Sequence, residues 1–126
     1  METGVNARAI DFAKFGQLYL DGGSWQGKQV LSQDWVLEST SPQSAPPSED
    51  YYSEFFRSMP GGGYYGYMWW GMARGDNDYD FTAEGDKGQF IYISPLKNLL
   101  IIRNGTGYGL PSTDWQNLFY QFATEF

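Results

Sequence analysis

The sequence contains no cysteine and no histidine among its 126 residues. These two absences exclude zinc fingers and ribbons, disulfide frameworks, Cys–His dyads and Ser-His-Asp triads within the chain. Any chemistry must therefore use carboxylates, lysine, tyrosine, serine or threonine. The sequence predicts neither a metal ion nor a cofactor.

Positive charge and long hydrophobic runs are also scarce. Eight Lys and Arg face 15 Asp and Glu, which gives a net charge of −7. Nucleic-acid binding relies on cationic side chains that neutralise phosphates, so we expect no nucleic-acid partner. No apolar run approaches the roughly 20 residues of a membrane-spanning helix, and residues 1–4 lack the features of a signal peptide. The sequence predicts no membrane span and assigns no compartment, and it is compatible with a periplasmic or secreted parent protein.

Aromatic residues and glycine are abundant by contrast. Aromatic side chains make up 19% of the chain beside 16 glycines, with a mean hydropathy of −0.50. Large aromatic side chains bury much apolar surface, which excludes a disordered chain. The length of 126 residues predicts one domain over residues 1–126.

The first forty residues have helical patterns. Asn6 is expected to cap a mostly buried helix that ends at Gly22–Gly23, and residues 25–31 to form a short hairpin. Ser32 is expected to cap a second helix. Residues 41–63, rich in proline and glycine, predict a long loop that acts as a lid or lies against a missing partner.

From residue 64 the patterns change to those of strands. Alternating apolar runs separated by short turns predict an antiparallel sheet. The expected strands are 65–72, 79–84, 89–94 and 99–104. A final amphipathic helix is expected from a cap at Ser112 or Thr113 to Phe126. The fold class predicted is α+β, an antiparallel sheet flanked by N- and C-terminal helices.

Three short motifs are interpreted as chance matches. Asp76-x-Asp78-x-Asp80 resembles the start of a calcium loop, but its sixth position is Phe81 rather than glycine. The glycines of 105–109 lack the spacing and the βαβ setting of a dinucleotide site. Ser94-x-x-Lys97 has the spacing of a serine–lysine nucleophile. That pair belongs at a helix start, whereas Pro95 and a predicted turn follow Ser94 here.

Residues 84–89, Glu-Gly-Asp-Lys-Gly-Gln, form a more informative segment. Glycines at the edge of a strand let a substrate or another backbone approach closely, and exposed amides there can stabilise an oxyanion. The alternative interpretation is an ordinary tight β-turn.

The ordered segments 4–23, 25–31, 35–36, 65–70 and 83–95 together resemble the serine β-lactamase-like hydrolases. That family includes class C β-lactamases, related esterases and aminohexanoate-dimer hydrolases. The resemblance covers nearly the whole chain and corresponds to the C-terminal part of the family fold. It implies a partial β-lactamase/transpeptidase-like fold.

The resemblance implies a site on the strand and turn at Gly85, Asp86, Lys87 and Gly88. In this family a backbone amide at this strand completes the oxyanion hole, which here would be the N–H of Asp86. The S-x-x-K and Y-x-N motifs of the family are absent in their proper setting, so we expect no catalytic residue in this chain and no activity of the chain alone. Ala83-Glu84-Gly85 replaces the K-T-G of the lactamases, which favours an esterase or amidase over a true β-lactamase.

These implications define the expected partners. The parent protein is expected to be a serine hydrolase of a small ester or amide, and this chain to pack against the missing N-terminal part or to self-associate through exposed aromatic surface. A different class remains as the alternative. Acidic, aromatic-rich β domains also suit a non-catalytic module that binds carbohydrates or other planar ligands.

Overall fold

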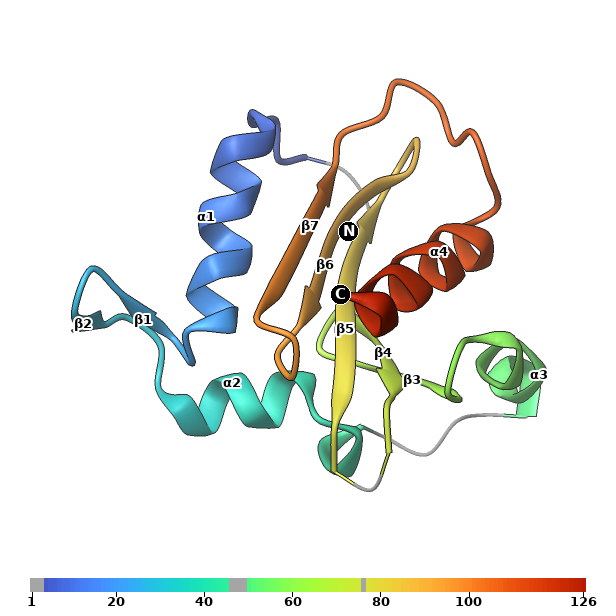
Figure 1. Cartoon of the computed structure of the whole chain (residues 1–126), viewed down its shortest axis with the longest axis horizontal. Helices are drawn as coiled ribbons and strands as arrows, with labels where there is room; N and C mark the ends of the chain where they lie inside the picture. Colours follow the sequence, from blue (N-terminus) through green and yellow to red (C-terminus); the bar gives the residue numbers. More distant parts are fainter. Residues whose placement is uncertain (1–3, 46–49, 76) are drawn as a thin grey trace.

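The computed structural model describes residues 4–45, 50–75 and 77–126. Its five main strands follow one another without an intervening helix, as the α+β interpretation predicts, and Figure 1 shows helices on both sides of one main sheet. In chain order they are α1 (Ala9–Leu20), β1 (Ser24–Trp25), β2 (Lys28–Gln29), α2 (Gln33–Thr40), the 3₁₀ helix η1 (Pro42–Ser44), α3 (Asp50–Ser58), β3 (Gly63–Gly66), β4 (Trp69–Ala73), β5 (Tyr79–Gly85), β6 (Gln89–Ser94), β7 (Leu99–Arg103) and α4 (Ser112–Glu125).

The main sheet has the order β3-β4-β5-β6-β7, and every neighbouring pair is antiparallel. Strands that follow one another in sequence are therefore neighbours in space, as short connections require. Trp70 lies opposite Thr82, and Thr82 lies opposite Tyr92. Because side chains alternate between faces, these three residues point to the same side of the sheet.

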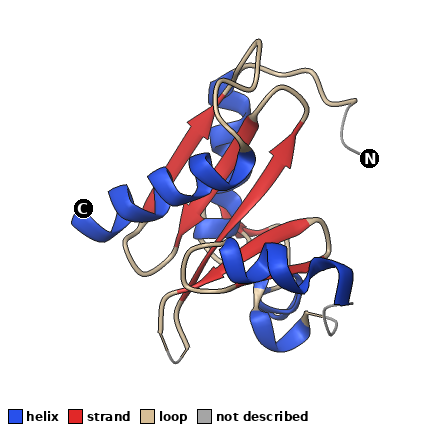
Figure 2. Ribbon diagram, turned by 90° about the vertical axis from the view of Figure 1, so that its right-hand side faces the viewer, coloured by secondary structure: helices blue, strands red, loops and turns tan. Residues whose placement is uncertain are grey.

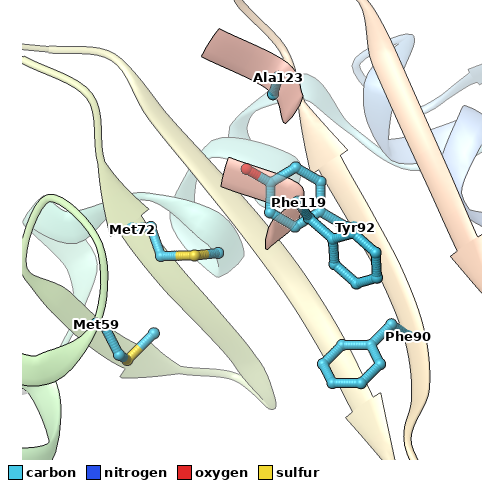
Figure 3. Packing of buried hydrophobic residues seen from close by; sticks show 6 residues of the cluster. All are labelled: Met59, Met72, Phe90, Tyr92, Phe119 and Ala123. Atoms are coloured by element: carbon cyan, nitrogen blue, oxygen red, sulfur yellow. The ribbon is translucent and has the colours of Figure 1, made fainter. Parts of the chain in front are cut away.

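That side is covered by α4, which crosses the sheet in Figure 2. Figure 3 shows the buried cluster beneath it, in which Phe119 and Ala123 of α4 meet Phe90 and Tyr92 of β6. The full set is Met59, Met72, Phe90, Tyr92, Phe119 and Ala123. The C-terminal helix predicted from the sequence is confirmed, although it begins at Ser112 with Pro111 as its N-cap.

The opposite side of the sheet packs against α1. Gly16 lies directly on Leu100 and Ile91, and a second buried cluster of Trp69, Phe81, Ile91 and Ile93 lies on this face. The absence of a side chain at Gly16 lets the helix approach the sheet closely. The two helices at the ends of the chain therefore flank opposite faces of the sheet.

Two expectations for the N-terminal helix are wrong. It begins at Ala9 after Arg8 rather than after an Asn6 cap. It is also not mostly buried, because Ile10 and Phe15 are 56% and 44% exposed and Gly16 is its buried residue. The Ser32 cap of α2 is confirmed, since its hydroxyl accepts a hydrogen bond from the Trp35 N–H at 3.1 Å.

The expectation of one long loop at 41–63 is wrong. This segment contains η1, α3 and the start of β3, while residues 46–49 lie outside the described part. The single strand expected at 65–72 is two strands, β3 and β4. Tyr67 and Met68 connect them with φ angles of 50° and 69°. Hairpin turns of this hand normally use Gly, Asn or Asp, and the absence of these residues at positions 67 and 68 explains why no turn is predicted there.

Gly71 of β4 lies directly beneath the ring of its cross-strand partner Tyr64. We expect Gly71→Ala to lower the free energy of unfolding by about 1–3 kcal/mol, because the added methyl group would overlap that ring. Gly107→Ala is the control, since a Cβ there would contact nothing within 4 Å. Urea unfolding of both variants checks this. Equal stabilities would contradict the close approach of Tyr64.

No helix in the described residues is long and apolar enough to cross a membrane.

Candidate active site

The turn between β5 and β6 brings the predicted site residues together. β5 ends at Gly85, which pairs with Gln89 at the start of β6, so Asp86, Lys87 and Gly88 connect the strands. Lys87 and Gly88 have φ angles of 60° and 72°, in the left-handed region. Such a conformation is costly at a lysine, so contacts around the turn must hold it in place. The Lys87 side chain itself is exposed.

The first of these contacts comes from the side chain of Gln89. Its Nε2 donates to the carbonyl of Asp86 at 3.1 Å and to the carbonyl of Gly105 at 2.6 Å. Its Oε1 accepts from the N–H of Gly105 at 3.1 Å. One amide group thus fixes the turn and the loop after β7 against each other.

Arg103, at the end of β7, makes the second set of contacts. Its guanidinium donates to the main-chain carbonyls of Lys87, Gly88, Gly107 and Tyr108. It lies 4.3 Å from the ring centroid of Trp115, whose Nε1 donates to the carbonyl of Tyr108 at 2.8 Å. Arg103 was not predicted as a site residue. The one feature of the sequence that indicates its role is its position, because a single arginine ends an apolar strand just before a glycine-rich loop.

Asp86 is exposed, and its carboxylate and its main-chain N–H differ in their hydrogen bonding. Its carboxylate accepts from the hydroxyl of Tyr108 and, at 2.9 Å, from the N–H of Lys87. The Tyr108 hydrogen bond is the main reason that the pKa of Asp86 lies below its usual value of 3.8. Among the turn and loop hydrogen bonds of the described residues, none is donated by the Asp86 N–H.

Glu84 lies one residue before the turn, on the face of the sheet that α4 covers. The Ser112 hydroxyl and, at 2.5 Å, the Nε2 of Gln116 donate to its two carboxylate oxygens. The Ser112 hydroxyl therefore binds Glu84 and makes no capping hydrogen bond to its own helix. Burial raises the pKa of Glu84 above 4.5, although both hydrogen bonds oppose the shift.

The raised pKa of Glu84 predicts a pH-dependent contribution to stability. Between 4.5 and the higher folded pKa, the folded state binds more protons than the unfolded state at this site, so this contribution to the free energy of unfolding falls as pH rises. We expect the free energy of unfolding of the wild type minus that of Glu84→Gln to decrease from pH 4 upward. Urea unfolding across that range measures it. A difference that stays constant or grows with pH would contradict the assigned shift.

Two hollows lie beside this turn, and Asp86 lines both. One has a volume of about 320 Å³ and is bordered by Tyr65, Met68, Trp70, Glu84, Gly85, Asp86, Tyr108 and Ser112. The other, of about 380 Å³, lies between residues 4–7 and 104–106. Asp86 thus lies between two spaces that are large enough to receive a ligand.

Comparisons with known proteins bear on this site. No family model matches the chain. The 6-aminohexanoate-dimer hydrolase of Paenarthrobacter ureafaciens is 29% identical over 115 residues, which are 91% of this chain and 28% of that protein. A solved structure of a Bacillus anthracis protein assigned by name to the same hydrolases has a TM-score of 0.64 at 24% identity. The match covers 97% of this chain and 30% of that one.

The chain is thus similar in sequence and fold to 6-aminohexanoate-dimer hydrolases. It has a β-lactamase-like fold, and it spans less than a third of the length of either protein. The resemblance found in the sequence is confirmed. The oxyanion-strand residues remain predictions that rest on the geometry of the turn.

Ser94 and Lys97 lie away from the β5–β6 turn. Ser94 ends β6 at the opposite end from Gln89 and is fully buried. Pro95 and Lys97 belong to the turn before β7 rather than to the start of a helix. The pair therefore lacks the helical setting in which a lysine one turn after a serine can accept its proton.

The calcium-like segment also has a structural explanation. Asp76 lies outside the described residues, and Asp80 is fully buried in a salt bridge with Arg74. Within the described ranges of the chain, no group of three or more Asp, Glu, Cys or His side chains is arranged to hold a metal ion.

Proposed function

We propose that this chain is the C-terminal portion of a serine-type hydrolase of small esters or amides, and that it supplies one main-chain amide of the oxyanion hole. The observation that carries the proposal is the β5–β6 turn. Gln89 and Arg103 hold its carbonyls from outside, while the N–H of Asp86 makes no turn or loop hydrogen bond within the described residues. A fixed donor of this kind stabilises a negatively charged oxygen without reorganising.

The composition indicates which catalytic groups this chain does not supply. The chain has no histidine or cysteine, and its one serine–lysine pair has the wrong setting, so the nucleophile and its base come from the rest of the parent protein. The similarity to 6-aminohexanoate-dimer hydrolases supports hydrolysis of an amide or an ester. The chain alone is inactive and associates with the N-terminal part or with itself. Exposed aromatic side chains such as Phe122 and Tyr67, each 50% exposed, supply surface for that contact.

Reconstitution tests this proposal. The chain is assayed alone and together with the polypeptide encoded upstream of it, with p-nitrophenyl acetate as the ester and the 6-aminohexanoate dimer as the amide. We expect no turnover by the chain alone and turnover by the combination. Turnover by the chain alone, or none by a folded combination, would contradict it.

A further inference from the structure

The hollow bordered by Glu84 and Tyr108, here called the acidic aromatic cavity, has an unusual wall. Its lining residues are Tyr65, Met68, Trp70, Glu84, Gly85, Asp86, Tyr108 and Ser112. Three of them are aromatic and two are acidic. Of the described residues that border it, none is lysine or arginine. Its volume of about 320 Å³ leaves room for a small organic group.

The aromatic side of the cavity is built from neighbouring strands. Tyr65 of β3 and Trp70 of β4 lie opposite each other, with ring centroids 4.4 Å apart. Tyr108 approaches from the loop after β7 and donates its hydroxyl to Asp86. The face of an aromatic ring carries negative potential and attracts cations, and tryptophan does so most strongly.

The acidic side carries the charge of two carboxylates, of which that of Asp86 is partly offset by the nearby Lys87 ammonium group. The hydrogen-bond donors to Glu84 and Asp86 are the neutral groups of Ser112, Gln116, Tyr108 and a main-chain N–H. Within the part of the chain that the structure describes, neither carboxylate has a cationic nitrogen within the 4.0 Å of a salt bridge. A cation placed in the cavity would supply the missing charge.

The kind of cation follows from the same hydrogen bonds. Both oxygens of Glu84 and one oxygen of Asp86 already accept from protein donors. A group recognised by charge and ring contact, with no hydrogens to donate, suits such a wall better than a primary ammonium group, which seeks free acceptors.

We propose that the acidic aromatic cavity binds a quaternary ammonium group. This inference rests on the proposed function for its catalytic meaning, because it makes the substrate an ester or amide that carries a trimethylammonium-type group. Asp86 links the two roles. Its N–H belongs to the proposed oxyanion hole, and the residue is also part of the cavity wall.

The test compares choline with 3,3-dimethylbutan-1-ol, a neutral molecule of nearly the same shape. Binding to the chain is measured by titration calorimetry and by the fluorescence of tryptophan. We expect choline to bind about tenfold more tightly than the neutral alcohol, because only choline gains the charge and ring interactions. Equal binding of the two molecules, or no binding of choline, would overturn the proposal.

Matched variants locate the site. Glu84→Gln is expected to weaken choline binding about tenfold, whereas Glu125→Gln removes the same charge at the exposed end of α4 and is expected to leave it unchanged. Equal losses in the two variants would show a general surface attraction and overturn the proposal. If Glu84→Gln fails to fold, the comparison of choline with its neutral analogue in the wild-type chain still decides.

The outcomes separate this inference from the proposed function, because choline binding requires no turnover. Choline binding that depends on Glu84, in a protein that shows no hydrolysis after reconstitution, would support the quaternary ammonium site and contradict the proposed hydrolase function. Hydrolysis of p-nitrophenyl acetate without choline binding would support the hydrolase function and contradict the quaternary ammonium site.

Discussion

Arg74→Met is expected to lower the free energy of unfolding by about 3–5 kcal/mol, because it leaves the carboxylate of Asp80 buried without its partner. The Arg74 and Asp80 side chains are 6% and 0% exposed, and Nε lies 2.5 Å from Oδ2. Arg74 also donates at 2.7 Å to both the carbonyl of Tyr120 and the hydroxyl of Thr124 in α4. Its loss therefore loosens α4 from the sheet as well.

The control for Arg74→Met is Arg8→Met. Arg8 pairs with Asp11 at 3.1 Å, but their side chains are 79% and 36% exposed. Water screens the attraction in exposed pairs, which therefore contribute little to stability, so this variant is expected to stay close to wild type. Urea unfolding of both variants is the measurement. A loss below about 1 kcal/mol at Arg74 would show that the buried pair is solvated in the folded chain.

Asp86→Pro is expected to lower kcat of the reconstituted hydrolase on the order of 100- to 1,000-fold, because it removes the proposed oxyanion N–H. Two backbone features are compatible with proline at this position. Gly85 before it is in an extended strand, which proline favours, and Asp86 is not among the residues with positive φ. Steady-state kinetics with p-nitrophenyl acetate, a substrate without a cationic group, measures the effect.

Asp86→Ala separates the amide from the side chain. It keeps the N–H and removes the carboxylate, so its loss of kcat is expected to be far smaller than that of Asp86→Pro. Thermal melting establishes that both variants fold. Equal losses of kcat in two folded variants would place the function of Asp86 in its carboxylate and remove the main-chain amide from the proposed site.

Glu84, just before the turn, shows which properties of a site residue can be predicted from the sequence and which cannot. Glu84 is visible in the sequence as a departure from the lactamase pattern, but its environment is not. Ser112 and Gln116, 28 and 32 residues later, reach it only because α4 crosses that face of the sheet. The environment of Arg103 is likewise not visible in the sequence, because its carbonyl partners belong to two separate loops.

Local signals in the sequence determined the antiparallel strands from 79 onward, the Ser32 cap, the C-terminal helix and the turn at Gly85–Gly88. Alternation, capping and turn chemistry act over a few residues, so they can be predicted from nearby sequence. The turn at Tyr67–Met68, the Arg74–Asp80 pair and the acidic aromatic cavity were decided only by the tertiary structure. Each depends on segments brought together by packing, whose energy no local pattern of residues encodes.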